Sequence, residues 1–456
     1  MGQNHTSNVL ALSCTHNGSP DEHAHAHKQL ERLLQQLVER SSGTEALNEF
    51  EKSTKGKYKT NIAKWECLSM AIRFLSTWGK YRTMVAFAIG QIELANDVGQ
   101  QEQVSTTATS SWRRVIIQAD SYLNLARGNL MLSNFSKSCD YAQKCLDLIG
   151  SIHGGSNESI LICGHAFLIR GKGYLGLSNL KLALESIEKS LSVAHSYDNK
   201  ALECLACCAM AAFYLEVKDY EKATFFPTKA SELLSEYGKE WNKSFSITTQ
   251  LSLAAAYRKV GKLEEAMRTC EDVMQLALEE KDRLAQAYCM LNFADVHRVR
   301  KDSERSLPRY DAALGLMIET GHRYGQVLVA IGKAKAYIRG KEFQQALQQY
   351  SAGLQLAESI GCKVVSMRIH GELAVLYQRM SDQERARSNT LSYHRLMEFI
   401  GLFCGVCSEA FGEKHELLEA LPCSHLFHLK CVAEEGILDT MSCPTCQKSA
   451  LKTAIL

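Results

Sequence analysis

The chain has 456 residues, and its 52 lysines and arginines against 50 aspartates and glutamates leave a formal charge of +2. This balance gives no global electrostatic reason to bind nucleic acid, and 46% hydrophobic residues exclude a disordered chain. The longest uncharged apolar run, Cys204 to Leu215, is shorter than the ~18 residues that span a bilayer. The sequence therefore predicts no transmembrane helix.

The N-terminus carries a lipidation signal. Its first residues, Met-Gly-Gln-Asn-His-Thr, match the N-myristoylation pattern, with Gly2 exposed after removal of the methionine and Thr6 at the required position. We predict that residues 1–27 form a flexible acylated segment that reaches the inner leaflet of a membrane. A single myristoyl chain binds membranes only marginally, with an association constant on the order of 10⁴ M⁻¹. The alternative is a cytosolic adaptor in which Gly2 is unmodified.

Residues 28–160 carry a weak repeat signal, and residues 161–400 carry a strong one. In the strong part a small residue, an aromatic residue three positions later and a second small residue nine positions after that recur six times. The second small residues are Ala183, Ala223, Ala266, Ser306, Ala346 and Ala386. Four of the five intervals between them are equal, and the remaining one is three positions longer.

Apolar residues recur every three or four positions on both sides of each turn, so each unit is predicted to be a pair of antiparallel helices. The aromatic residues, such as Tyr174 and Tyr257, are predicted to fill the space between the two helices. The units resemble the tetratricopeptide repeat, whose period is ~34 residues. The longer period here predicts either longer helices or longer links. Upstream, Leu34 with Ala46, Gly79, and Ala126 with Ser138 suggest three weaker units.

Eight cysteines and histidines dominate the C-terminal end, at residues 401–448. They follow the order C-x2-C, fifteen residues, C-x-H-x2-H-x2-C, eleven residues, C-x2-C. The eight are Cys404, Cys407, Cys423, His425, His428, Cys431, Cys443 and Cys446. Two tetrahedral zinc sites need eight such ligands. The segment therefore predicts two structural Zn²⁺ ions, with residues 449–456 as a tail.

The ligand order resembles that of RING domains with two histidines. In that family the first and third ligand pairs share one ion, and the second and fourth share the other. The resemblance therefore implies one site from Cys404, Cys407, His428 and Cys431, and a second site from the other four residues.

Many RING domains recruit a ubiquitin-conjugating enzyme through apolar residues in two loops. Val406 and Pro444 match those positions, and either Ile437 or Leu438 is expected to supply the apolar contact in the loop before Cys443. Active ligases often carry an arginine directly after the last ligand, where this chain has Gln447. That departure counts against ligase activity without excluding it.

An apolar stripe runs straight into the zinc module. Leu396, Phe399, Ile400 and Phe403 lie at helical spacing and are predicted to cap the last repeat. The RING is then expected to be docked on the solenoid and not to swing from a linker.

The combination of lipid signal, repeats and RING resembles the rapsyn family of cytoplasmic scaffolds. Local runs carry the resemblance: Ser-Tyr-Leu-Asn-Leu-Ala-Arg at 121–127, Val-Lys-Asp-Tyr-Glu-Lys-Ala at 217–223, Phe-Ala-Asp-Val-His-Arg at 293–298 and Leu-Pro-Cys-Ser-His-Leu-Phe-His-Leu-Lys-Cys at 421–431. The resemblance implies a mostly α, tetratricopeptide-like solenoid with a small two-zinc RING, acylated at Gly2.

The resemblance also implies a function. The expected role is a non-enzymatic scaffold that self-associates through its repeats and clusters nicotinic acetylcholine receptors at the cytoplasmic face of the postsynaptic membrane. The expected partners are the cytoplasmic regions of the receptor, further copies of the chain, and a cytoskeletal or dystroglycan-type linker. No residue is expected to be catalytic. The alternative is a RING-type ligase for ubiquitin or a ubiquitin-like protein, whose repeats select the substrate.

Overall fold

The computed structural model describes residues 20–56, 60–101, 108–151, 156–237, 243–412, 417–434 and 442–449. Within these residues the chain forms 19 helices and one two-stranded sheet. No helix in the described part of the chain is long and apolar enough to cross a membrane. The predicted fold class, a mostly α solenoid of helical hairpins with a small C-terminal zinc domain, is confirmed.

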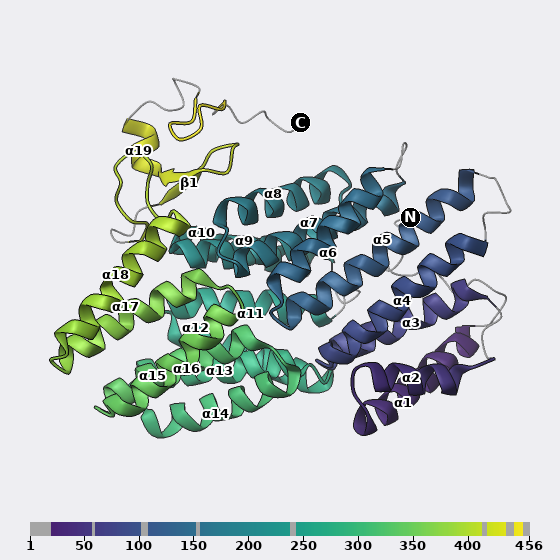
Figure 1. Ribbon diagram of the computed structural model, residues 1–456, viewed down its shortest axis with the longest axis horizontal. Coiled ribbons are helices and arrows are strands. Elements are labelled where there is room, and N and C mark those ends of the chain that lie inside the picture. Colours follow the sequence, from purple (N-terminus) through teal and green to yellow (C-terminus); the bar gives the residue numbers. More distant parts are fainter. Residues whose placement is uncertain are drawn as a thin grey trace.

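Eighteen helices pair in chain order into nine hairpins, and the two helices of each hairpin pack on one another. They are α1 (Pro20–Arg40), α2 (Thr44–Thr54), α3 (Asn61–Thr77), α4 (Tyr81–Gln101), α5 (Ala108–Met131), α6 (Phe135–Gly150), α7 (Asn157–Gly176), α8 (Leu180–Ser196), α9 (Lys200–Val217), α10 (Tyr220–Tyr237), α11 (Lys243–Lys259), α12 (Leu263–Glu279), α13 (Arg283–Val299), α14 (Ser303–Thr320), α15 (Arg323–Arg339), α16 (Phe343–Ser359), α17 (Lys363–Arg379) and α18 (Gln383–Ile400). Figure 1 shows α1 and α2 at one end of the long axis and the C-terminal domain at the other.

Longer helices, and not longer links, explain the long period of the repeat. Helices α11 to α18 have 17 or 18 residues each, and only two or three residues separate them. A residue with positive φ stands in every one of these turns, at a constant interval along the chain. In the seven turns these residues are Gly261, Lys281, Lys301, Gly321, Lys341, Gly361 and Ser381, and Gly401 follows α18 at the same interval. A left-handed residue at this place ends an α-helix and lets the next amide bond back into it, as Glu342 N–H does to the Tyr337 carbonyl (2.9 Å).

The small residues of the repeat are buried where paired helices meet. A Cβ atom on Gly171 would come within 2.7 Å of Ile187 Cγ1 and 3.2 Å of the Ala183 carbonyl oxygen. In the weaker N-terminal part, Ser138 Oγ donates to the Ala126 carbonyl across the hairpin of α5 and α6 (2.9 Å). Small side chains therefore set the close approach of the two helices in both parts of the array.

The aromatic residues of the repeat are less buried than predicted. Tyr214 and His297 are buried, but Tyr174, Tyr257, Tyr337 and Tyr377 are only half-buried. The small residues already close the space between the helices, so that these rings stay partly exposed. There, cations cover two of the rings: Lys262 Nζ lies 5.8 Å from the ring centre of Tyr257, and the Arg385 guanidinium 5.7 Å from that of Tyr377.

Helix α1 begins earlier than the predicted boundary between the flexible segment and the repeats. It starts at Pro20, inside the segment 1–27. Proline suits the first position of a helix because its missing N–H has no partner there. Gly2 lies outside the described residues.

The solenoid winds back on itself, so that its C-terminal hairpins touch its N-terminal ones. Lys80 forms an ion pair with Glu319 (3.1 Å). Two turn serines also cap helices far along the chain: Ser133 Oγ accepts from the Tyr324 N–H (2.9 Å), and Ser178 Oγ accepts from the Val364 N–H (2.8 Å). The N-cap residues of α15 and α17 themselves form no capping side-chain bond.

Candidate metal centre

The C-terminal domain is built around a short hairpin and two turns of similar shape. Strand β1 (Leu418–Ala420) pairs antiparallel with β2 (Leu426–His428), and the six-residue helix α19 (Leu429–Glu434) follows. A domain as small as the segment from Cys404 to Cys446 buries too little apolar surface to stay folded without metal staples.

Each C-x2-C pair sits in a tight turn, and the two turns have the same backbone conformation. Cys404 N–H donates to the Glu409 carbonyl (2.9 Å), and Cys443 N–H donates to the Lys448 carbonyl (2.8 Å). The residue after the second cysteine has positive φ in both turns, at Ser408 (59°) and Gln447 (58°). This conformation turns the two thiols of each pair toward the same point.

The structure gathers the eight cysteines and histidines into two groups. Cys404, Cys407, His428 and Cys431 form one, and Cys423, His425, Cys443 and Cys446 form the other, each with ligand atoms within 4.8 Å of one another. These are the two sets that the RING resemblance implies. Each set combines residues from distant parts of the domain, so that a metal ion in the first site would tie its N-terminal end to its middle, and one in the second site its C-terminal end.

The spacing of the donor atoms fits zinc. Bond lengths of ~2.3 Å to sulfur and ~2.0 Å to nitrogen place sulfur and nitrogen about 3.5 Å apart on a tetrahedron. The Nδ1 atom of His428 lies 3.3 Å from Cys407 Sγ and 4.0 Å from Cys431 Sγ. The Nδ1 atom of His425 lies 3.3 Å from Cys423 Sγ and 3.7 Å from Cys443 Sγ. Four protein donors close each site, as in structural zinc centres and not in catalytic ones.

Backbone amides favour the thiolate form at two of the ligands. The Lys448 N–H lowers the pKa of the Cys446 thiol. Burial works against ionisation of Cys404, but the backbone N–H of Cys407 and others bring the pKa of that thiol below its ordinary value. Because thiolates bind zinc and thiols do not, these amides prepare the sites for metal. The ring of the buried His428 packs edge-on against Phe411, with centroids 5.4 Å apart, which fixes its orientation.

The residues predicted to contact a conjugating enzyme fall in different situations. Pro444 is exposed, and Val406 is half-buried, each inside one of the two cysteine turns. Ile437 and Leu438 lie outside the described residues. Gln447 is exposed at its left-handed position beside Cys446.

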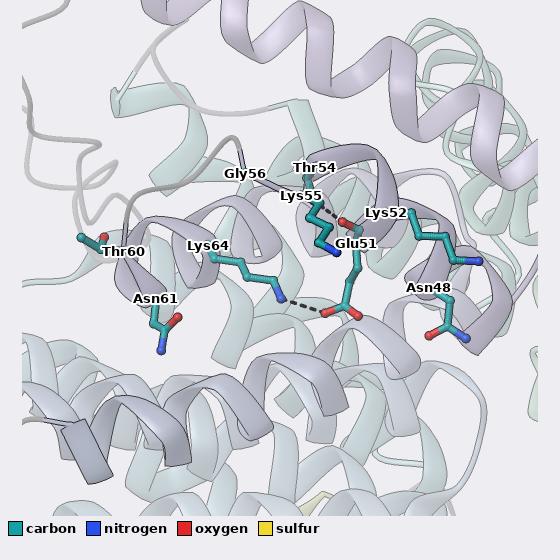
Figure 2. A pocket seen from close by; sticks show the side chains of 9 residues that line it. All are labelled: Asn48, Glu51, Lys52, Thr54, Lys55, Gly56, Thr60, Asn61 and Lys64. Carbon is teal, nitrogen blue, oxygen red and sulfur yellow. Dashed lines mark hydrogen bonds and ion pairs between the residues drawn. The ribbon is translucent and has the colours of Figure 1, made fainter.

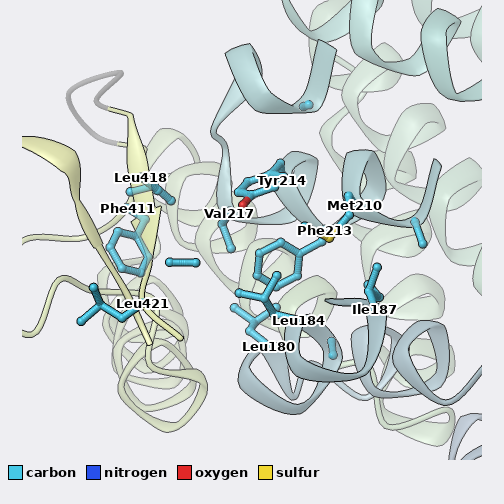
Figure 3. Packing of buried hydrophobic residues seen from close by; sticks show 14 of the residues in the cluster. Leu180, Leu184, Ile187, Met210, Phe213, Tyr214, Val217, Phe411, Leu418 and Leu421 are labelled. Atoms are coloured by element: carbon cyan, nitrogen blue, oxygen red, sulfur yellow. The ribbon is translucent and has the colours of Figure 1, made fainter. Parts of the chain in front are cut away.

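The zinc domain packs on the solenoid through a shared apolar core. Phe411, Leu418 and Leu421 of the domain belong to one buried cluster with Leu180 of α8 and Val217 of α9. Figure 3 shows the two groups of side chains facing one another. The contact is close enough that a Cβ atom on Gly412 would approach Lys218 Cδ to 2.4 Å.

Polar bonds at the start of α10 fix the same contact. Asp219 caps α10 by accepting from the Lys222 N–H (3.1 Å), and its other oxygen accepts from the Leu418 N–H of β1 (3.1 Å). Lys222 Nζ donates to the Leu418 carbonyl and pairs with Glu419 (3.3 Å). Ser424 Oγ donates to Glu188 Oε2 (3.2 Å).

Sequence reasoning predicted a docked zinc domain but missed these residues. In the run at 217–223, an aspartate with a lysine three positions later is a helix-start pattern, but nothing in it indicates a bond to the zinc domain. The predicted apolar stripe is half right. Leu396 and Ile400 pack against the shared core, whereas Phe399 is 69% exposed and Phe403 38%.

Comparisons with known proteins match both parts of the chain. Residues 402–447 match the family model described as Ring finger domain. A Tetronarce californica protein named 43 kDa receptor-associated protein of the synapse is 39% identical over 389 residues, which are 85% of this chain and 89% of that protein. A Gallus gallus protein of the same name is 38% identical over 374 residues, 82% of this chain and 85% of that protein.

Solved structures support the fold alone. The crystal structure of a Rap protein complexed with Competence and Sporulation Factor covers 84% of this chain and 99% of its own, with a TM-score of 0.54 and 11% identity. The Rap conjugation gene regulator of the plasmid pLS20, in complex with the Phr* peptide, gives the same TM-score. On the similarity to the two synaptic proteins, which covers more than four fifths of this chain, the chain belongs to the family of the 43 kDa receptor-associated protein of the synapse, the rapsyn family.

Proposed function

We propose that the chain is a membrane-associated scaffold that self-associates through its repeats and clusters nicotinic acetylcholine receptors at the cytoplasmic face of the postsynaptic membrane. A cytoskeletal or dystroglycan-type linker would anchor the assembly. The observation that carries the proposal is the similarity, over more than four fifths of the chain, to two proteins named for receptor association at the synapse.

The eight cysteines and histidines act in this proposal as ligands of two structural zinc ions. Their donor spacing fits tetrahedral zinc, and four protein ligands leave no open position for a substrate. Bound zinc would hold the domain in shape, and the contacts of Asp219 and Lys222 would hold it against the solenoid. A rigid arrangement of repeats and zinc domain supports a scaffold, since it keeps binding surfaces at fixed separations.

The test is co-expression with receptor subunits in a non-muscle cell. We expect receptor clusters with the parent protein and diffuse receptors with Gly2→Ala, which removes the acylation site. Gly315→Ala is the matched control, because a Cβ atom at Gly315 meets nothing within 4 Å. Diffuse receptors with the parent protein would refute the scaffold role. Clusters that persist with Gly2→Ala would refute the need for the lipid.

A second proposed function is that of a RING-type ligase for ubiquitin or a ubiquitin-like protein. The observation in its favour is that Pro444 is exposed and Val406 half-buried, each in one of the cysteine turns, while the domain docks through β1 and its neighbours. An in vitro assay over a panel of conjugating enzymes should show transfer that Val406→Ala abolishes. Leu429→Ala, at an apolar residue 42% exposed, is the control.

Position 447 gives the ligase proposal a test that increases activity. Gln447 is exposed and adopts a left-handed conformation directly after the last ligand. Gln447→Arg restores the residue that active ligases often carry there, so transfer should rise if the domain is a ligase. No transfer with any conjugating enzyme, by the parent or by this variant, would rule the ligase out.

A further inference from the structure

An open hollow of about 540 Å³ lies between the end of α2 and the start of α3. Figure 2 shows the side chains around it, which are polar or charged in every case except Gly56. Three are lysines, Lys52, Lys55 and Lys64, and among the described residues that line the hollow Glu51 is the only carboxylate. The hollow therefore has a surplus of positive charge in a chain that is close to neutral overall.

Two of the three lysines are available to a ligand. Lys64 Nζ is held by Glu51 at 2.9 Å. Lys52 and Lys55 are exposed, and among the residues that the structure describes neither forms an ion pair. The sequence from Lys52 to Lys64 contains five lysines and no acidic residue. Two of the five, at positions 57 and 59, lie outside the described residues.

The start of helix α3 adds further positive potential to the hollow. Thr60 caps this 17-residue helix by accepting from the Ala63 N–H (3.2 Å), and Thr60 and Asn61 both line the hollow. The first amides of a helix carry its positive dipole end and favour anionic groups. Lysine ammoniums and a helix N-terminus thus converge on one opening, which is the chemistry that recognises phosphate groups.

We propose that this basic hollow binds anionic lipid headgroups at the inner leaflet and acts as the second membrane attachment beside an acyl chain on Gly2. The proposal rests on the membrane-associated role proposed above. One myristoyl chain gives only marginal membrane binding, and stable attachment needs a second signal such as a basic patch.

The position of the hollow suits this role. Gly2 precedes Pro20 along the chain, and α1, α2 and the hollow all belong to the N-terminal end of the molecule (Figure 1). The zinc domain is at the opposite end of the molecule (Figure 1), where it would face away from the bilayer.

The test uses the full chain with Gly2→Ala, so that no acyl chain contributes, and measures co-sedimentation with vesicles. We expect binding to vesicles of phosphatidylcholine mixed with a minor share of phosphatidylserine, and none to vesicles of phosphatidylcholine alone. Each lysine near an anionic surface contributes about fivefold in affinity, equivalent to about 1 kcal/mol. Lys52→Gln with Lys55→Gln should therefore weaken binding by at least about tenfold.

A matched control and a variant with the opposite effect make the test decisive. Lys281→Gln with Lys301→Gln removes the same charge from exposed turns of other hairpins and should leave binding unchanged. Glu51→Gln removes the only carboxylate of the hollow and releases Lys64, so it should tighten binding severalfold, which misfolding would not do.

Equal weakening by both lysine pairs, or no tightening by Glu51→Gln, would overturn the proposal. The vesicles contain no receptor. A negative result here therefore leaves the receptor-clustering assay unaffected, and loss of clustering leaves vesicle binding unaffected.

Discussion

The carboxylate of Asp219 joins the solenoid to the zinc domain, and its removal gives the sharpest test of that contact. One oxygen caps α10 and the other accepts from the Leu418 N–H in the interior (3.1 Å each). Asp219→Ala loses the cap, which costs about 1 kcal/mol. It also leaves a buried amide without a partner, which costs about 1–3 kcal/mol more. The cost of the unpaired Leu418 amide falls on the docked zinc domain.

A second aspartate provides a control in which only a helix cap is lost. Asp382 caps α18 by accepting from the Arg385 N–H at the same distance of 3.1 Å, and the structure gives it no bond to the zinc domain. Asp382→Ala should therefore cost about 1 kcal/mol at its own helix and leave β1 unchanged.

A repeat array opens locally and has no single unfolding free energy. Amide hydrogen exchange of the zinc-loaded protein therefore separates the loss of the helix cap from the loss of the bond to Leu418. In Asp219→Ala the peptide around Leu418 should exchange about 5 to 150 times faster, which corresponds to about 1–3 kcal/mol. In Asp382→Ala it should not change. Unchanged exchange at Leu418 in Asp219→Ala, or equal acceleration in both variants, would refute the role of this bond in docking.

Three further predictions concern zinc, pH and the closure of the solenoid. A chelator should release two zinc ions per chain and abolish the hydrogen-exchange protection of residues 417–434, while α11 to α16 keep their helicity. Retained protection in the metal-free protein would contradict the zinc assignment. Burial, with help from the nearby cations Arg127 and Lys172, lowers the pKa of His165 to about 3. Folding therefore favours the neutral imidazole of His165. The folded state is fully stable with respect to this group above pH 6.5, and it loses up to about 2 kcal/mol of stability as the pH falls to 5. His165→Gln should make the opening of α7, followed by hydrogen exchange, less sensitive to acid, and an unchanged pH profile would count against this. Finally, Ser178→Ala should destabilise the first turn of α17 by about 1 kcal/mol. Adding Cys362→Ser, which places a capping hydroxyl at the N-cap position of α17, should restore it. Failure of this rescue in hydrogen exchange would argue against capping by the distant Ser178.

Local rules were enough to predict the hairpins and the zinc domain. The spacing of small residues such as Ala183 and Ala223 reports one helix pair per repeat, because close approach of paired helices depends on residues near in sequence. The set of eight zinc ligands came from their order within one short segment, and the resemblance to RING domains implied how they divide into two sites. In both cases the information lies close in sequence to the structure it determines.

Contacts between distant hairpins could not be predicted in the same way. Ser133 and Ser178 stand in ordinary turns, and nothing in their own neighbourhood indicates that they cap α15 and α17. Their role depends on how far the solenoid rotates per repeat, which many small packing terms decide together. The half-buried tyrosines have the same origin, since their exposure depends on the separation that the small residues permit.

The distant contacts change how the molecule should respond to force and to ligands. In an open solenoid each repeat touches only its neighbours, and its two ends move independently. Here Ser133 and Ser178 fasten the C-terminal hairpins to the N-terminal half, and Asp219 fastens the zinc domain to α10. Bending the array would have to break capped amides in addition to apolar contacts. The basic hollow at one end and the zinc domain at the other are therefore held at a fixed distance, and a scaffold that binds a membrane at the first end presents the second at a defined height above it.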